Sequence, residues 1–240
     1  MSVSVQDIVA AQAHIGTLKN EAHPKTSKYW SEVTNGVVVI NPEAIAEQLE
    51  AAKAQVAAAK AAGKEILVVC EKKMYAAELE ALAKKTGARL HVFHLSTAAE
   101  TELFGNNIPL KDKKITAEVC VHHLWFSEDD YTTRGAFIKW NPAVKTADDR
   151  TALWRALLDD RLDVIATDHA PHTLEEKQRK GYTNIPSGAP LVQHSLVAML
   201  EKAHKGSISI KKIVEKMCHN PAILFQVKDR GFLREGYYAD

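Results

Sequence analysis

This 240-residue sequence contains few cysteines and has no marked excess of either charge. Its three cysteines, Cys70, Cys120 and Cys218, are far apart and form no CxxC pair. This usage favours a reducing cytoplasmic setting over a disulfide framework. With 31 basic and 30 acidic residues, the formal net charge of +1 provides no general attraction to nucleic acid or to an anionic membrane.

Long apolar runs and phosphate-binding glycine motifs are also missing. No apolar run approaches the roughly 20 residues that span a bilayer, and the first residues lack the pattern of a signal peptide. Neither G-x-G-x-x-G nor a P-loop follows an expected strand, so no nucleotide site is indicated. The pair Lys72-Lys73 is more typical of a solvated helix start than of a phosphate site. We therefore expect a soluble cytoplasmic protein without a membrane partner.

Residues 1–87 are expected to alternate strands and helices. A short strand at 37–40 follows an Asn-Gly turn, and Asn41-Pro42 then opens a helix that Gly63 ends. A second strand at 65–70 and a helix from 74 to about 85 follow. This βαβα order is the one that builds parallel sheets, so it predicts a Rossmann-like segment.

Residues 1–85 resemble the amino-terminal part of bacterial small-subunit ribosomal protein two. The resemblance rests on the elements 7–11 (Asp-Ile-Val-Ala-Ala), 13–16 (Ala-His-Ile-Gly), 23–25 (His-Pro-Lys), 35–41 and 63–69. It implies a Rossmann-like domain and a nucleic-acid partner, ribosomal RNA, although Thr17 stands where that family has a second histidine. The alternative function is therefore a structural component of the small ribosomal subunit, whose RNA binding weakens steeply with salt.

In the second part of the chain, the stretch 162–172 carries the strongest functional signal. An apolar, β-branched run at 164–166 leads into Thr-Asp-His and is stopped by Pro171, which is typical of a buried strand in a parallel sheet. Asp168 is then expected at the carboxyl end of that strand, where ligands bind in parallel α/β folds. The carboxylate either caps the following turn or binds a metal or cation.

Two further expected strands also end in polar side chains. The segment 89–97 contains His94, and the strand at 115–121 leads into His122-His123. Three such endings predict one shared site, as on the carboxyl face of a barrel. Imidazole and carboxylate groups are good zinc ligands, and a zinc-bound water ionises near neutral pH. A carboxylate beside that water can accept its proton and return it to a leaving nitrogen.

Residues 88–240 resemble the carboxyl-terminal part of dihydroorotases, which are metal-dependent (β/α)8 barrels of the amidohydrolase superfamily. The motifs that carry the resemblance are 90–97 (Leu-His-Val-Phe-His-Leu-Ser-Thr), 118–124 (Glu-Val-Cys-Val-His-His-Leu), 139–143 (Lys-Trp-Asn-Pro-Ala), 163–172 (Asp-Val-Ile-Ala-Thr-Asp-His-Ala-Pro-His), 186–188 (Pro-Ser-Gly), 219–222 (His-Asn-Pro-Ala) and 229–231 (Asp-Arg-Gly). The resemblance implies the reversible ring closure of N-carbamoyl-aspartate to dihydroorotate, a step of pyrimidine biosynthesis.

The same resemblance implies roles for single residues. His94 and Asp168 match zinc ligands, and Asp168 also matches the catalytic base and acid. The small-molecule substrate is expected to contact Asn141, His172, Pro186 and Gly188, the last two on a loop against the pyrimidine ring. For His122 and His123, hydrogen bonding behind the metal ligands and direct ligation both stay open.

Several metal ligands of that family are missing from this sequence. Its first-strand His-x-His triplet, its bridging lysine and its fifth-strand histidine have no counterparts here. Two protein ligands are fewer than the three that usually hold catalytic zinc. We expect an α/β protein in which a Rossmann-like segment, residues 1–87, is joined to a partial (β/α)8 barrel of the amidohydrolase type, residues 88–240. The hydrolase is expected to be incomplete alone, unless another chain, for example in a homo-oligomer, supplies the missing ligands.

Overall fold

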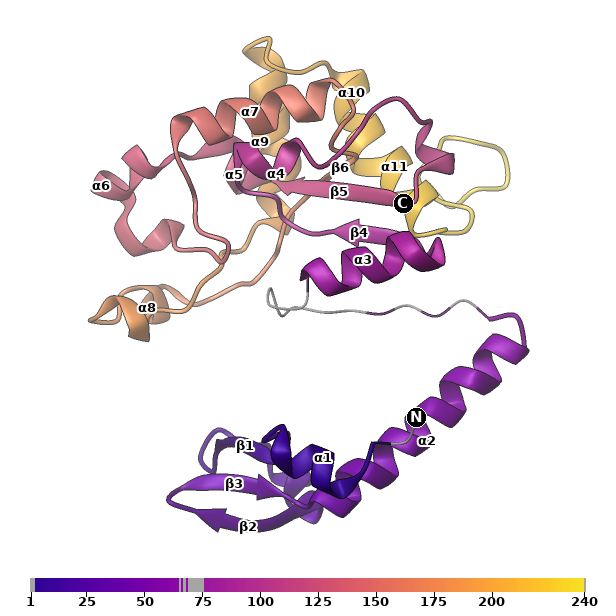
Figure 1. Ribbon diagram of the computed structural model, residues 1–240. Coiled ribbons are helices and arrows are strands. Elements are labelled where there is room, and N and C mark those ends of the chain that lie inside the picture. Colours follow the sequence, from indigo (N-terminus) through magenta and orange to yellow (C-terminus); the bar gives the residue numbers. More distant parts are fainter. Residues whose placement is uncertain (1–2, 65, 67, 69–75, 240) are drawn as a thin grey trace. The chain divides into compact units, whose positions relative to one another are not determined.

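The computed structural model describes residues 3–64, 66, 68 and 76–239. The chain divides into two units, Met1–Lys72 and Lys73–Asp240, which are described separately below (Figure 1). Within the described ranges, no helix is both long and apolar enough to cross a membrane.

The first unit contains a three-stranded antiparallel sheet. Its strands are β1 (Ile15–Leu18), β2 (Trp30–Thr34) and β3 (Val37–Ile40), in the order β1-β3-β2. Its helices are α1 (Val5–Ala10), α2 (Pro42–Ala61) and a 3₁₀ segment at Pro24–Tyr29. A cleft of about 680 Å³, lined mainly by apolar side chains of the sheet and of α2, lies within this unit.

The expected strand at 37–40 and the helix after it are confirmed, but the sheet they join differs from the expected one. Asn41 accepts hydrogen bonds from the first-turn N–H groups of α2, and Pro42 opens that helix. Asn35 and Gly36 both have positive φ, so they form a two-residue hairpin between β2 and β3, and such a hairpin makes its strands antiparallel. The expected strand at 65–70 and Lys72-Lys73 lie largely outside the described residues, so the Rossmann-like segment stays a prediction.

The second unit is built on three parallel strands. They are β4 (Leu90–Val92), β5 (Ile115–Cys120) and β6 (Val164–Ala166), in the order β4-β5-β6. The helices of this unit within the described residues are α3 (Ala76–Thr86), α4 (Ala98–Thr101), α5 (Val121–Trp125), α6 (Tyr131–Arg134), α7 (Ala147–Leu158), α8 (Leu174–Lys177), α9 (Val192–His204), α10 (Ile210–Val214) and α11 (Asn220–Leu224). Shorter 3₁₀ or π turns lie at Leu110–Asp112, Glu128–Asp130, Gly135–Ile138, Tyr182–Asn184 and Glu215–His219.

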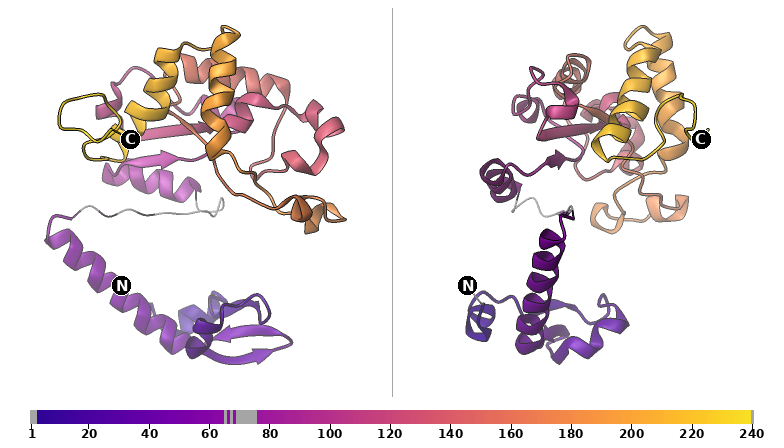
Figure 2. Two further views of the ribbon diagram at one scale, coloured as in Figure 1. Left: turned by 180° about the vertical axis from the view of Figure 1, so that it is seen from behind. Right: turned by 90° about the vertical axis from the view of Figure 1, so that its right-hand side faces the viewer.

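The core of this unit surrounds β5. Ala117 and Val119 of this strand are fully buried and belong to a cluster with side chains of α7, α9 and α10. Seen from behind, α9 and α10 lie in front of the strands (Figure 2). The central strand is buried along most of its length, although Thr116 and Glu118 interrupt its apolar sequence.

A buried ion pair joins the amino-terminal ends of β5 and β6. Lys113 Nζ lies 2.7 Å from Asp163 Oδ1, and the Ala117 N–H donates to Asp163 Oδ2 at 3.1 Å. Lys113 also donates to the carbonyl of Asp160 at 2.8 Å. These contacts tie the segment before β5 to the start of β6, and they thereby align the carboxyl ends of the two strands.

Three boundaries in this unit differ from the expected ones. The strand expected at 89–97 ends at Val92, because His94 has a positive φ of 42°. His122 and His123 lie in the short helix α5 rather than at a strand end. The pair Ser96-Thr97 also predicts the start of a helix at 98–104, and that helix, α4, ends at Thr101. By contrast, the sequence Thr146-Ala147-Asp148-Asp149 predicts the cap of a helix that runs through Leu158, and this prediction is confirmed. The helix α7 begins after Thr146, whose side chain forms a capping box with Asp149.

Candidate metal and active site

His94 and Asp168 follow the carboxyl ends of β4 and β6, on either side of β5. The strands point the same way, so these ends meet at one edge of the sheet (Figure 1). Both residues are half-buried and have positive φ, 42° for His94 and 46° for Asp168. Non-glycine residues in this region are uncommon and tend to cluster at functional sites.

The surroundings of Asp168 affect its protonation. Burial raises the pKa of the Asp168 carboxyl, the nearby His94 imidazole lowers it, and Glu118 raises it. His94 therefore lies close enough to interact with this carboxylate. In the described part of the chain no hydrogen bond to either side chain is found, so their lone pairs are free for a ligand.

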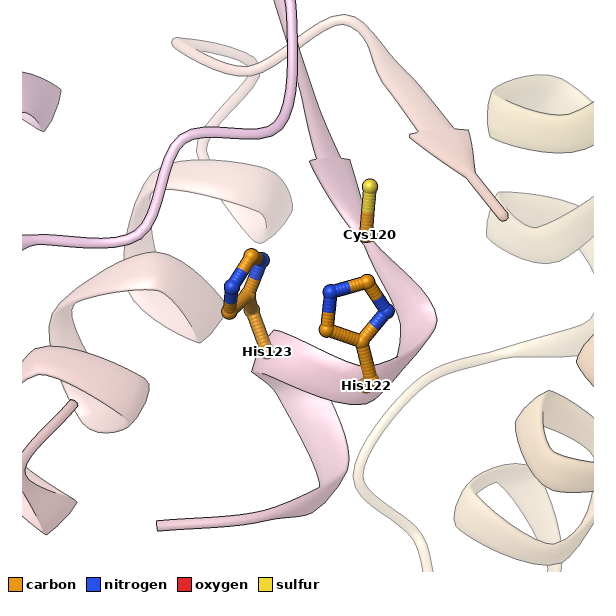
Figure 3. Close-up of side chains that lie close together, drawn as sticks. All are labelled: Cys120, His122 and His123. Carbon is orange, nitrogen blue, oxygen red and sulfur yellow. The ribbon is translucent and has the colours of Figure 1, made fainter. Parts of the chain in front are cut away.

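A second cluster lies where β5 passes into α5. Cys120, His122 and His123 are all buried, and one ligand atom of each lies within 4.8 Å of the others (Figure 3). Within the described residues, this is the one group of three or more His, Cys, Asp or Glu side chains close enough to share a metal ion. The His122 ring stacks on Trp140, with ring centroids 4.3 Å apart and planes 7° apart.

Burial keeps both histidines of this cluster neutral. It lowers the pKa of His122 to about 2, helped by the neighbouring His123 and His94. It lowers the pKa of His123 to about 4. The Cys120 thiol has a pKa raised well above its ordinary value, by burial first and by Glu118 and Asp168 next. Within the described contacts, neither His122 nor His123 forms a hydrogen bond to His94 or Asp168. The sequence left open whether these two histidines support the metal ligands by hydrogen bonds, and no such bond is seen there.

The loop with Pro186 and Gly188 packs against the loop that follows Asp168. His172 Nε2 donates to the Ser187 carbonyl at 3.0 Å, because a carbonyl oxygen can only accept. Gly188 has a φ of +118°, and a Cβ there would lie 2.5 Å from the Ala170 Cβ. Only glycine therefore allows the two loops to approach so closely.

Lys177 is a buried residue beside this loop that the sequence analysis did not single out. Its side chain is buried, and its Nζ donates to the carbonyls of Gly188 at 3.0 Å and Pro186 at 3.1 Å. Burial, and next the charge of Lys139, lower the pKa of Lys177. Nothing in the local sequence distinguishes this lysine from a solvated one, since its partners lie in another loop.

Asn141 lies next to the same loop. The Gly188 N–H donates to the Lys139 carbonyl at 2.9 Å, which holds the segment before Asn141 against residues 186–188. The Asn141 side chain is exposed. The structure thus brings together the segments that carry the four expected substrate contacts, whose roles stay predictions.

A model of the Amidohydrolase family matches residues 13–240. The chain belongs to the amidohydrolase family. It is 35% identical over 156 residues to the dihydroorotase of Halobacterium salinarum, covering 65% of this chain and 35% of that protein. It is 38% identical over 160 residues to the dihydroorotase of Carboxydothermus hydrogenoformans, covering 66% and 37%. This amidohydrolase chain therefore spans a little over a third of the length of these curated relatives.

Solved structures share the fold of about two thirds of this chain. The L-hydantoinase (dihydropyrimidinase) of Arthrobacter aurescens matches with a TM-score of 0.60 and 29% identity, over 68% of this chain and 37% of that one. The dihydroorotase of Saccharomyces cerevisiae in complex with 5-fluoroorotic acid matches with a TM-score of 0.56 and 17% identity, over 69% and 49%. At that identity, the second likeness concerns the fold alone.

Membership of the amidohydrolase family bears on two expectations. These matches give no support to the ribosomal alternative, and the family match begins at residue 13, within the stretch that resembles a ribosomal protein. Dihydroorotase-like amidohydrolases are typically metal-dependent, which agrees with the donors present at the carboxyl edge of the sheet. In donor type, an imidazole and a half-buried carboxylate fit such a metal, although two donors are fewer than the usual three.

Proposed function

We propose that this chain supplies the carboxyl-terminal part of a dihydroorotase-type active site. In this proposal β4, β5 and β6 are neighbouring strands in the wall of a (β/α)8 barrel. The reaction is the reversible interconversion of N-carbamoyl-aspartate and dihydroorotate. The observation that carries the proposal is the position of His94 and Asp168 at the carboxyl edge of the sheet, in a segment that is 35–38% identical to dihydroorotases.

His94 and Asp168 would hold the metal, and zinc suits an imidazole with a carboxylate. Zinc bound there supplies a water that ionises near neutral pH. The remaining ligands have to come from outside these residues, because no His-x-His triplet occurs in the sequence. Glu118 adds negative charge near the Asp168 carboxylate, and a bound cation would offset that charge.

Asp168 is proposed to move the proton. In the hydrolytic direction the ring C–N bond breaks and a C–O bond forms at the same carbon. The Asp168 carboxylate accepts the proton of the attacking water and returns it to the leaving ring nitrogen. Burial raises the pKa of this carboxyl toward the range in which a group both accepts and returns a proton.

The substrate ring is proposed to lie against Asn141 and residues 186–188. The exposed Asn141 amide offers both a donor and an acceptor to a planar ring. The Nε2–H of His172 donates a hydrogen bond to the Ser187 carbonyl. In this proposal His172 therefore positions the loop that contacts the substrate ring. Lys177 holds the same loop through the carbonyls of Pro186 and Gly188.

The proposal is tested by binding and turnover of dihydroorotate in zinc-containing buffer. We expect the purified chain to bind dihydroorotate and to open the ring slowly, because only two ligands are present. Asp168→Asn should abolish the ring opening, measured as N-carbamoyl-aspartate by chromatography. Asp148→Asn changes an exposed aspartate of α7 and should leave it unchanged. Absence of binding, or equal turnover in Asp168→Asn, would contradict the proposal.

A further inference from the structure

The strongest unassigned feature is the cluster of Cys120, His122 and His123. Its three residues lie within a stretch of four positions, 120–123, from the last residue of β5 to the first turn of α5 (Figure 3). Around a tetrahedral zinc-type ion with bonds of about 2.0–2.3 Å, donor atoms lie about 3.4–3.8 Å apart. The donor atoms here are within 4.8 Å of one another, so a side-chain movement on the order of 1 Å closes the set.

His123 is held in the form that binds a metal. Its Nε2 lies 3.1 Å from the Pro142 carbonyl oxygen, which can only accept, so Nε2 carries the proton. Nδ1 therefore presents a bare lone pair, and it is buried without a hydrogen-bond partner. Ligating histidines characteristically donate their other N–H to a carbonyl or carboxylate in this way, which fixes the tautomer and the ring orientation.

His122 is also buried without hydrogen bonds. Neither of its two buried ring nitrogens has a hydrogen-bond partner in the described structure. One face of the ring is covered by Trp140, which fixes the ring plane. Buried polar atoms without partners are rare because they cost free energy, and a bound ion is one of the few things that explains them.

We propose that Cys120, His122 and His123 bind one transition-metal ion of the zinc class. One thiolate and two imidazoles are the donors that zinc and its close neighbours prefer over calcium or magnesium. All three side chains are buried, and three protein ligands leave the fourth position of a tetrahedral ion to a water or to another donor. It shares no donor with the His94 and Asp168 pair, although it lies within electrostatic range of it, and it does not depend on the proposed function.

Cobalt(II) is the probe, because a cysteine-bound cobalt ion gives a sulfur-to-metal charge-transfer band in the near ultraviolet. The metal-free full chain is titrated with cobalt both when folded and during refolding, since a buried site can load slowly. We expect one equivalent bound with this band, and excess zinc should displace it. Absence of the band under both loading conditions overturns the proposal.

Matched variants locate the ion. Cys120→Ser keeps the size of the side chain and should remove the band, and His123→Gln should weaken cobalt binding at least tenfold. Cys218→Ser changes the exposed free cysteine and should keep the band. Asp168→Asn should also keep it, which separates this site from the one proposed for hydrolysis. A band that survives in Cys120→Ser, or is lost in Cys218→Ser, overturns the assignment, with circular dichroism confirming the fold of each variant.

Discussion

At the scale of single residues, the hydrogen bonds of the histidine nitrogens decide which rings can still bind a ligand. His91 places one nitrogen on Thr116 and the other on Glu118, so it is a packing residue with both nitrogens engaged. His172 is committed to Ser187, and His123 keeps one nitrogen free. Of these three rings, His123 is therefore the one with a buried nitrogen that lacks a partner.

The buried histidine pair should make stability fall at acidic pH. The folded-state pKa values, about 2 for His122 and about 4 for His123, lie below the ordinary 6.5, so folding favours the neutral rings. This stability is fully present above pH 6.5 and is lost as the pH falls below it, by up to about 1.4 kcal/mol per pH unit for each ring. Replacing His122 with Phe should remove one such contribution while keeping the stacking on Trp140.

The measurement is the free energy of unfolding in urea between pH 6.5 and 4.5. His122→Phe should lose less stability over this range than the natural chain, whereas His204→Gln, at an exposed position, should follow the natural chain. Identical slopes for the natural chain and His122→Phe would contradict the assigned burial.

Gly188→Ala should disrupt the loop proposed to contact substrate. The added Cβ would meet the Ala170 Cβ at 2.5 Å and the Ala170 carbonyl oxygen at 2.6 Å, at a φ of +118°. Strain and overpacking together should cost about 2–4 kcal/mol. Gly206→Ala is the control, since its φ of +77° is also positive but no atom lies within 4 Å; it should cost about 1 kcal/mol. Thermal unfolding and amide exchange at residues 187–189 measure both effects. Equal effects of the two substitutions would argue against the close loop contact.

At the level of secondary-structure elements, one buried ion pair aligns two strands. Lys113 and Asp163 are both buried, and removing one partner leaves the other charge without compensation. Lys113→Met should therefore destabilise the chain by about 3–5 kcal/mol. The exposed pair Lys205 and Glu201 supplies the control, because Lys205→Met should change stability by less than about 1 kcal/mol. Urea unfolding distinguishes the two, and a small effect of Lys113→Met would mean that β5 and β6 are aligned by their backbone bonds alone.

For the whole molecule, the second unit contains every group discussed for metal binding and for hydrolysis. Its main core cluster also draws only on residues after Lys73. We expect residues 73–240, expressed alone, to fold with the near-ultraviolet circular dichroism of their aromatic residues and to bind cobalt as the full chain does. A chain that stays unfolded would show that the first unit is needed for the core.

Local signals were sufficient for the sequence to predict particular elements. Thr146 caps α7 and Asn41 caps α2 because capping depends on residues two or three positions apart. His94 and Asp168 were also found from local sequence, because each closely follows a short apolar run that forms a strand. The antiparallel sheet of the first unit was missed, because the strand at Trp30–Thr34 carries a weak pattern and its pairing depends on the hairpin.

The sequence by itself determined the family resemblance, the parallel strands around 115–120 and 164–166, and the residue types at their ends. Only the tertiary structure decided which of those side chains have partners. The Pro142 carbonyl that orients His123 is 19 residues away, the Trp140 ring covers His122, and Lys177 bonds a loop 9 to 11 residues further on. Burial and free lone pairs arise from such distant neighbours, whereas caps, turns and strand patterns depend on adjacent residues.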